Sequence, residues 1–185
     1  MLYEPAEDSY LLLEQVKKHA KGKVLDLGTG TGILAEAALE RTKDVLAADI
    51  NEEAVNFVKK KGIKAVRSDL FSNIKGRFDL IIFNPPYLPK EVREPDDSAL
   101  STTGGKKGSE IIERFLCEAK EHLEKDGKIL MIFSSLTPNV DKLIKKYNYK
   151  HKKLSEKSFF FEKLYVYLIE NSGRENILGY KALFF

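Results

Sequence analysis

The sequence predicts an α/β fold in which helices cover both faces of a mostly parallel sheet. Three observations support this prediction: short apolar runs rich in β-branched residues recur along the chain, segments with helical spacing separate the first five runs, and the last two runs follow one another without a helix. Buried strands that alternate with helix-length segments are typical of parallel sheets, because each crossover between parallel strands needs such a connection.

The periodicity places each element. A first helix is expected over residues 5–20, where Leu11, Leu12, Leu13 and Val16 form an apolar side. Strands are expected over 23–27, 44–48, 63–67, 78–83, 128–134, 148–154 and 163–169, with further helices over 32–41, 52–61 and 108–124. Because little more than Phe159–Phe161 joins the last two strands, they form a hairpin, and the final strand of this seven-stranded sheet runs antiparallel.

Length and composition suit one compact domain over residues 1–185. The charged fraction is 32%, but the formal net charge is only +3, which is too weak to indicate nucleic acid as a bulk partner. Cys117 is the only cysteine, so neither a disulfide framework nor a cysteine-rich metal site is expected, and no metal is predicted. Residues 171–185, which contain Gly173 and Gly179, are an extension that forms either a terminal strand or a docked tail.

No apolar run approaches the ~20 residues that a membrane-spanning helix needs. The first residues, MLYEP, contain neither a basic segment nor an apolar segment of a secretory signal. We therefore expect a cytoplasmic protein without a membrane partner.

A glycine-rich loop follows the first predicted strand in the segment VLDLGTGTG, residues 24–32. The spacing is G-x-G-x-G, whereas the dinucleotide fingerprint requires G-x-G-x-x-G. Asp26 lies two positions before the first glycine, where it could meet a positively charged amine of a cofactor. A turn that merely packs a helix on a strand is the simpler alternative. The cofactor contacts expected here are Asp26, Gly28, Thr29, Gly30 and Gly32.

Two further acids follow the next predicted strands. Asp49 comes about 20 residues after the loop, where a carboxylate could accept both hydrogen bonds of a ribose diol. Asp69 could accept from an adenine amino group, and Ile50 or Leu70 could flank the ring. Each acid alone would be a helix cap or a solvated loop residue. Three acids at successive strand ends indicate a ligand site, because open α/β sheets bind ligands at that edge.

The segment Asn84-Pro85-Pro86-Tyr87 follows the fourth predicted strand. Two adjacent prolines fix the backbone and remove two N–H donors, so a carbonyl and the Asn84 side-chain oxygen can accept from an NH₂ group. Tyr87 could stack on a flat amide or base. We expect Asn84, Pro85 and Tyr87 to act in catalysis by orientation, and Pro86 to complete the substrate-binding loop. A packed double-proline turn is the alternative.

Together, the glycine loop, Asp49, Asp69 and residues 84–87 resemble class I methyltransferases, which have a Rossmann-like fold and modify exocyclic or amide nitrogens. Within that group the chain is similar to the HemK-like protein glutamine N5-methyltransferases of the short archaeal and eukaryotic branch. Residues 3–9 (YEPAEDS), residues 104–108 (GGKKG) with 112–115 (IERF), and the paired C-terminal strands support this, over roughly residues 3–170. The NPPY motif also occurs in adenine-N6 and guanine-N2 methyltransferases.

The resemblance implies S-adenosylmethionine as cofactor and, as substrate, the glutamine of the Gly-Gly-Gln loop of a class 1 peptide chain release factor. Asn84 with Pro85 would bind the glutamine amide, and Asn84 would also border the cofactor. A small zinc-binding activator subunit would complete a heterodimer, and the N-terminal helical domain of the bacterial branch is not expected. Residues 1–20 would cover the cofactor, with its methionine end under Pro5, Glu7, Asp8 and Ser9.

Two other functions compete with this hypothesis. A nucleic-acid methyltransferase could use the same pocket for adenine or guanine, with phosphates meeting the basic stretch of Lys142, Lys145, Lys146, Lys150, Lys152 and Lys153. Such stretches are more often a solvated surface. A non-catalytic binding module would predict a damaged NPPY motif or acid set, and both are intact.

Overall fold

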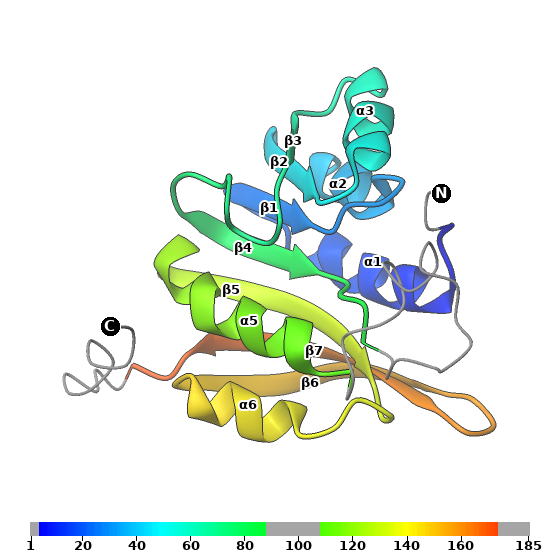
Figure 1. Ribbon diagram of the computed structural model, residues 1–185, viewed down its shortest axis with the longest axis vertical. Helices are drawn as coiled ribbons and strands as arrows, with labels where there is room; N and C mark the ends of the chain where they lie inside the picture. Colours follow the sequence, from blue (N-terminus) through cyan, green and yellow to red (C-terminus); the bar gives the residue numbers. More distant parts are fainter. Residues whose placement is uncertain (1–3, 88–107, 174–185) are drawn as a thin grey trace.

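The structure is a computed structural model that describes residues 4–87 and 108–173. Seven strands of this part of the chain form one sheet in the order β3-β2-β1-β4-β5-β7-β6 (Figure 1). Neighbours from β3 to β5 pair in parallel, and β7 runs antiparallel to both β5 and β6. The predicted mixed sheet and its terminal hairpin are therefore confirmed. The strands are β1 (Lys23–Leu27), β2 (Asp44–Asp49), β3 (Ala65–Arg67), β4 (Phe78–Phe83), β5 (Leu123–Ser134), β6 (Tyr149–Ser158) and β7 (Lys163–Asn171).

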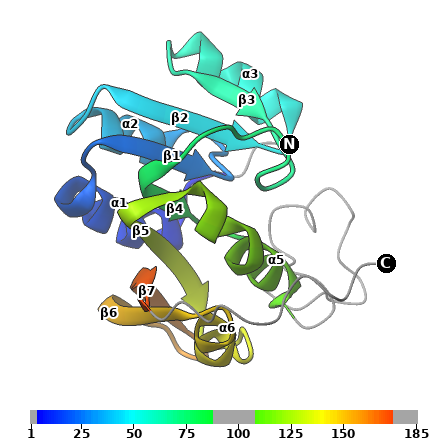
Figure 2. The ribbon, with the colours of Figure 1, turned by 90° about the vertical axis from the view of Figure 1, so that its left-hand side faces the viewer.

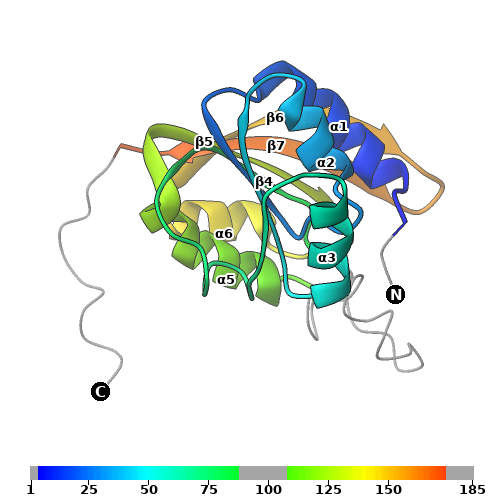
Figure 3. The ribbon, with the colours of Figure 1, turned by 90° about the horizontal axis from the view of Figure 1, so that it is seen from above.

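Helices cover both faces of the sheet, as the sequence predicts (Figures 2 and 3). One core lies under α1 (Glu7–His19), α2 (Ile33–Leu39) and Val58 of α3 (Glu52–Lys60). The other lies under α5 (Glu110–Ala119) and α6 (Val140–Lys146). Among the residues described, no helix combines the length and apolar character needed to cross a membrane.

The region between α5 and β5 differs from the sequence-based prediction. The helix expected to reach residue 124 ends at Ala119, and the short 3₁₀ helix η1 (Lys120–His122) leads into β5 five residues earlier than expected. Residues 124–126 of β5 are exposed, so the apolar pattern that predicts a strand is absent there. The register between β5 and β4 also shifts between Phe78 and Leu80 of β4. Such an irregularity interrupts the alternation on which strand prediction depends.

One further element and one further boundary differ from the prediction. Helix α6 was not expected, because it is only seven residues long and buries only Val140 and Ile144. Strand β7 continues to Asn171, so the predicted extension from residue 171 begins inside a strand, and residues 174–185 lie outside the described part of the chain.

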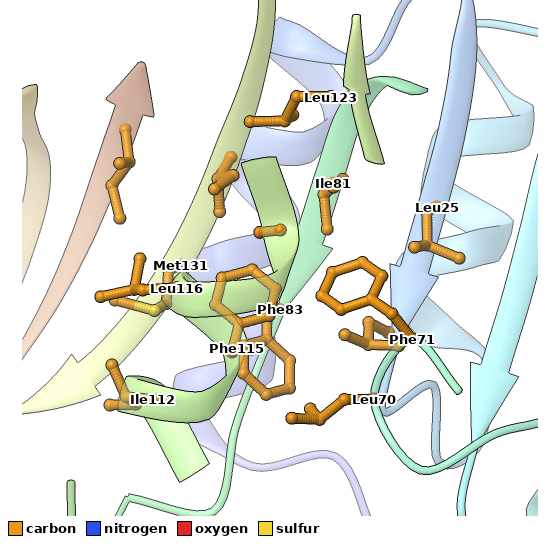
Figure 4. Packing of buried hydrophobic residues seen from close by; sticks show 14 of the residues in the cluster. Leu25, Leu70, Phe71, Ile81, Phe83, Ile112, Phe115, Leu116, Leu123 and Met131 are labelled. Carbon is orange, nitrogen blue, oxygen red and sulfur yellow. The ribbon is translucent and has the colours of Figure 1, made fainter. Parts of the chain in front are cut away.

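Aromatic packing fixes the end of β4. The Phe83 ring lies 4.3 Å from that of Phe115 on α5, and Phe115 in turn stacks on Phe71 at 5.7 Å (Figure 4). All three side chains are buried. Because Phe83 is the last residue of β4, this packing also sets the start of the loop that follows.

Candidate active site

The sheet register brings three of the predicted loops to one place. Leu27, the last residue of β1, pairs with Ala48 of β2 on one side and with Phe83 of β4 on the other. Gly28 and Asn84 directly follow β1 and β4, and Asp49 is the last residue of β2, so the three lie side by side at this edge of the sheet. Strand β1 lies between β2 and β4, and such a reversal of strand order opens a crevice at the carboxyl ends of parallel strands.

The glycine loop is held by β2 and by Asp49. The N–H groups of Gly28 and Thr29 donate to the Ala48 carbonyl over 2.8 and 3.0 Å. Asp49 Oδ2 accepts from the Gly30 N–H at 2.9 Å, and its Oδ1 accepts from the Asn51 N–H at 2.9 Å. Each carboxylate oxygen can accept a second hydrogen bond, so Asp49 is both fixed and still able to bind hydroxyl groups.

Positive φ angles explain why this loop needs glycine. Gly28, Gly30 and Gly32 have φ of 72°, 53° and 84°, in the left-handed region that side chains disfavour. A Cβ on Gly28 would lie 3.7 Å from the Asn84 carbonyl oxygen, which shows how close the glycine loop comes to the NPPY loop.

Asp26 is enclosed beneath the glycine loop. Its side chain is fully buried, and its Oδ2 accepts from the Thr29 hydroxyl at 2.6 Å, whereas its Oδ1 has no hydrogen-bond partner. Burial raises the pKa of this carboxyl from about 3.8 to about 7. A buried carboxylate oxygen without a partner fits a nearby cationic group, such as the ammonium of S-adenosylmethionine.

The third acid lies in a different setting. Asp69 is half exposed and forms an ion pair with Arg114 of α5 at 3.1 Å. Of the two residues expected to flank an adenine ring, Leu70 is buried in the core at a φ of 45°, while Ile50 is 43% exposed beside Asp49. Ile50 is therefore the one with a face available to a ligand.

The start of α1 contacts the NPPY loop directly. Buried Asp8 accepts at Oδ2 from Asn84 Nδ2 and from the Tyr87 hydroxyl, each at 3.2 Å. The Ser9 N–H donates to the other Asp8 oxygen at 2.6 Å, and Thr137 Oγ1 donates to the Tyr87 carbonyl at 2.9 Å. Since the Asn84 amide nitrogen donates to Asp8, its oxygen is the atom that can accept from a substrate.

The structure thus brings most of the predicted residues together. Asp8, Ser9, the glycine loop, Asp49 and the NPPY loop lie along one edge, with Pro85 buried and Pro86 half-buried. Glu7 is exposed and instead forms an ion pair with Lys157 of β6, whereas Pro5 is half-buried and precedes the helix. No group of three or more potential metal ligands occurs among the described residues.

Sequence reasoning missed three residues at this edge. Thr137, Arg114 and Lys157 each contact a predicted residue from an element distant in the sequence. Of the three, only Arg114 could have been found from the sequence, because it lies in residues 112–115, which resemble the HemK-like methyltransferases.

The fold and the site define a class of protein. This sheet, whose last strand is antiparallel, carries a glycine loop after β1, a carboxylate at the end of β2 and an amide–proline loop after β4. These are the parts of an S-adenosylmethionine-dependent methyltransferase.

Comparison with known proteins identifies the family. Residues 6–161 match the methyltransferase small domain family, so the chain belongs to this family. It is 42% identical over 145 residues, 74% of each protein, to a Methanocaldococcus jannaschii protein provisionally named a protein N5-glutamine methyltransferase. The structure also matches a chain of the E. cuniculi Mtq2–Trm112 complex, which is responsible for methylation of the eRF1 translation termination factor. The TM-score is 0.75 with 29% sequence identity, and the match covers 92% of this chain and 99% of that chain. The HemK-like resemblance is confirmed.

Other relatives are longer than the matched region. The chain is 34% identical over 139 residues to the release factor glutamine methyltransferase of Deinococcus radiodurans, where the match covers 66% of this chain and about half (49%) of that protein. It is also 31% identical over 147 residues to ribosomal RNA small subunit methyltransferase C of Haemophilus influenzae, 75% of this chain and 40% of that protein. Nucleic-acid enzymes are therefore also among its relatives.

Proposed function

We propose that this methyltransferase transfers a methyl group to the side-chain nitrogen of the glutamine in the Gly-Gly-Gln loop of a class 1 release factor. The observation that carries the proposal is the pair of hydrogen bonds by which Asp8 holds Asn84 and Tyr87. The same Asp8 belongs to the EPAED segment that resembles the glutamine N5-methyltransferases. The named relatives support a protein glutamine as the target.

The cofactor would lie across the ends of β1 and β2. Asp49 would accept from the ribose hydroxyls, Ile50 would lie against the adenine, and the glycine loop with Asp26 would hold the amino-acid end under Asp8 and Ser9. When bound, S-adenosylmethionine supplies an electrophilic methyl group on its sulfonium. We also propose that Asp69 contacts the adenine, and that Glu7 and Pro5 contact the methionine end of the cofactor.

The NPPY loop would orient the substrate amide. Asn84 Oδ1 and the Pro85 carbonyl would accept the two amide hydrogens, which draws electron density toward the nitrogen and aims its lone pair away from the loop. Tyr87 would border the amide plane, and Pro86 would keep the loop rigid. As the new N–CH₃ bond forms and the methyl–sulfur bond breaks to leave S-adenosylhomocysteine, the nitrogen would gain positive charge. The two acceptors would stabilise that charge until solvent water takes one proton from the nitrogen.

The test is methyl transfer with labelled S-adenosylmethionine to release factor, tRNA and oligonucleotides in parallel. We expect label on the release factor and its loss when the target glutamine is changed. Asn84→Ala should still bind the cofactor, because the glycine loop and Asp49 would make most of its contacts, yet lower turnover by about 10²–10³-fold, as for loss of a key polar group at a reacting centre. Asn171→Ala, in β7, is the matched control. Label only on nucleic acid would overturn the proposed substrate, and near-normal turnover of Asn84→Ala would refute its role.

A nucleic-acid substrate is the second candidate, since the ribosomal RNA methyltransferase relatives use a related domain. The basic stretch gives it limited support. Lys146, Lys150 and Lys153 each pair with a glutamate, namely Glu113, Glu170 and Glu156, so half of the six lysines are partly neutralised. Phosphate binding depends on unneutralised positive charge.

The partner would be a small zinc-binding activator subunit, as the family resemblance implies. The E. cuniculi complex, in which Mtq2 is bound to Trm112, supports a partner subunit but not its zinc. The transfer assay should therefore be run with and without such a subunit. We expect higher turnover when it is present, and equal turnover would contradict a role in activation.

A further inference from the structure

The turn between β6 and β7 exposes three consecutive phenylalanines. The Phe159 N–H donates to the Glu162 carbonyl at 2.7 Å and closes the turn. Phe159, Phe160 and Phe161 are 40%, 91% and 84% exposed, and none of them belongs to either core. The rings of Phe160 and Phe161 pack edge to face with their centroids 4.6 Å apart. Adjacent aromatic side chains exposed in this way mark an interaction surface. We call residues 159–161 the aromatic tip.

The aromatic tip lies at the edge of the sheet that carries the candidate site. Strand β6 is antiparallel to β7, and β7 is antiparallel to β5, so β6 ends at the same edge as β1, β4 and β5. The pairing of β7 with β5 begins at Leu164 opposite Ser134, so the turn extends beyond the end of β5. Figures 1 and 3 show this hairpin projecting past the sheet near the start of α1.

Two connections tie the aromatic tip to the NPPY loop. Lys157, just before the tip, pairs with Glu7 at the start of α1, and the next residue of that helix, Asp8, holds Asn84. On the other side, the Ser135 N–H donates to the Lys163 carbonyl at 2.7 Å, and Thr137 contacts the Tyr87 carbonyl. The tip is therefore held in place relative to the loop.

The charges around the aromatic tip favour a protein partner. Lys157 pairs with Glu7, Lys153 pairs with Glu156, and Glu162 lies within the turn itself. Acidic and basic groups thus alternate, whereas anionic lipid and nucleic acid both require an excess of positive charge. Exposed aromatic anchors with mixed charges around them are typical of protein–protein interfaces.

We propose that the aromatic tip is a docking site for the protein substrate. The tip contacts an apolar patch on that substrate, beside the substrate loop that carries the target side chain. This inference rests on the proposed function, because the occupant is the release factor. The tip would contribute affinity and orientation for the whole folded substrate, and it would leave the cofactor site and the chemistry unchanged.

The test compares wild type with Phe160→Ser/Phe161→Ser, using the full chain with any activator subunit that it requires. We expect KM for intact release factor to rise about tenfold or more, with kcat changed less than about twofold and S-adenosylhomocysteine affinity unchanged. In the presence of S-adenosylhomocysteine, the Kd of release factor for the variant should exceed its Kd for wild type by about the same factor. Phe57→Ser, which removes a 38% exposed phenylalanine of α3, is the matched control and should resemble wild type.

Other outcomes would overturn the inference. Unchanged KM and binding would show that the aromatic tip does not contact the substrate, and a fall in kcat alone would assign it to the active site. If only phosphatidylserine vesicle binding, self-association or activator binding were lost, the occupant would be a membrane, a second copy or the activator. Failure of wild type to methylate or bind release factor would instead reject the proposed function along with its docking site.

Discussion

At the scale of single residues, two aspartates at the same sheet edge have opposite environments. Asp49 accepts two backbone hydrogen bonds through its two oxygens, while Asp26 is fully buried with one oxygen unpartnered. Burial is the main cause of the raised pKa of Asp26, and the negative charge of Asp49 adds to it. A cationic ligand group close to Asp26 would lower that pKa again.

The raised pKa predicts a specific dependence of stability on pH. The Asp26 carboxyl titrates near pH 3.8 in an unfolded chain and near 7 in the folded protein, so between these values the folded state holds a proton that the unfolded state has lost. Its stabilising contribution is complete below pH ~4 and is lost as pH rises to ~7, a loss of a few kcal/mol at about 1.4 kcal/mol per pKa unit. We therefore expect Asp26→Asn to gain stability relative to wild type between pH 5 and 8 in urea unfolding without cofactor. A difference that does not vary with pH would contradict this.

The sequence predicted where the site lies, but it did not predict which residues of the site contact one another. The glycine loop and Asp49 could be found because they follow recognisable strands. The contact between Asp8 and Asn84 joins residues 76 positions apart, and no local pattern encodes it. The enclosure of Asp26 was also unforeseen, because burial beneath a loop depends on how the loop folds back.

At the scale of elements, the start of α2 depends on close packing against α3. Gly32 precedes α2 at a φ of 84°, and a Cβ there would lie 2.9 Å from Cγ2 of Val58. We expect Gly32→Ala to destabilise the protein by about 2–3 kcal/mol, from left-handed strain plus the clash. Gly62→Ala is the control, because Gly62 has a φ of 80° with no atom within 4 Å of an added Cβ, and should cost about 1 kcal/mol. Equal losses in urea unfolding would show that the packing of α2 on α3 is loose.

The elements themselves were predictable where periodicity is regular. Strands β1, β2 and β4 and the final hairpin were placed to within a few residues, because buried strands between helix-length segments have few alternatives. The start of β5 was not predicted, since three exposed residues interrupt its apolar run and its register with β4 shifts there. Helix α6 is too short for its period to be detected.

At the scale of the whole molecule, one sheet supports two cores and the candidate site. Strands β1, β4 and β5 contribute side chains to both cores, for example Leu25 and Val24 to opposite faces from adjacent positions of β1. The site lies where these strands end. A ligand bound there therefore stabilises an edge on which both cores depend, and unfolding should be a single transition. That residues 1–185 form one domain remains a prediction.

Cofactor binding should shift this transition as a whole. S-adenosylhomocysteine at 100 times its Kd should add about 2.7 kcal/mol, or roughly 5–10 °C in Tm for a protein of this size. Asp49→Ala should lose most of that shift, because it removes the proposed ribose acceptor, and its Tm without ligand should also fall as two backbone N–H groups lose their partner. The ligand-induced shift, measured by calorimetry for each protein, is thus the quantity to compare. Asp44→Ala, at the opposite end of β2, should keep the full shift. An undiminished shift in Asp49→Ala would refute the ribose contact.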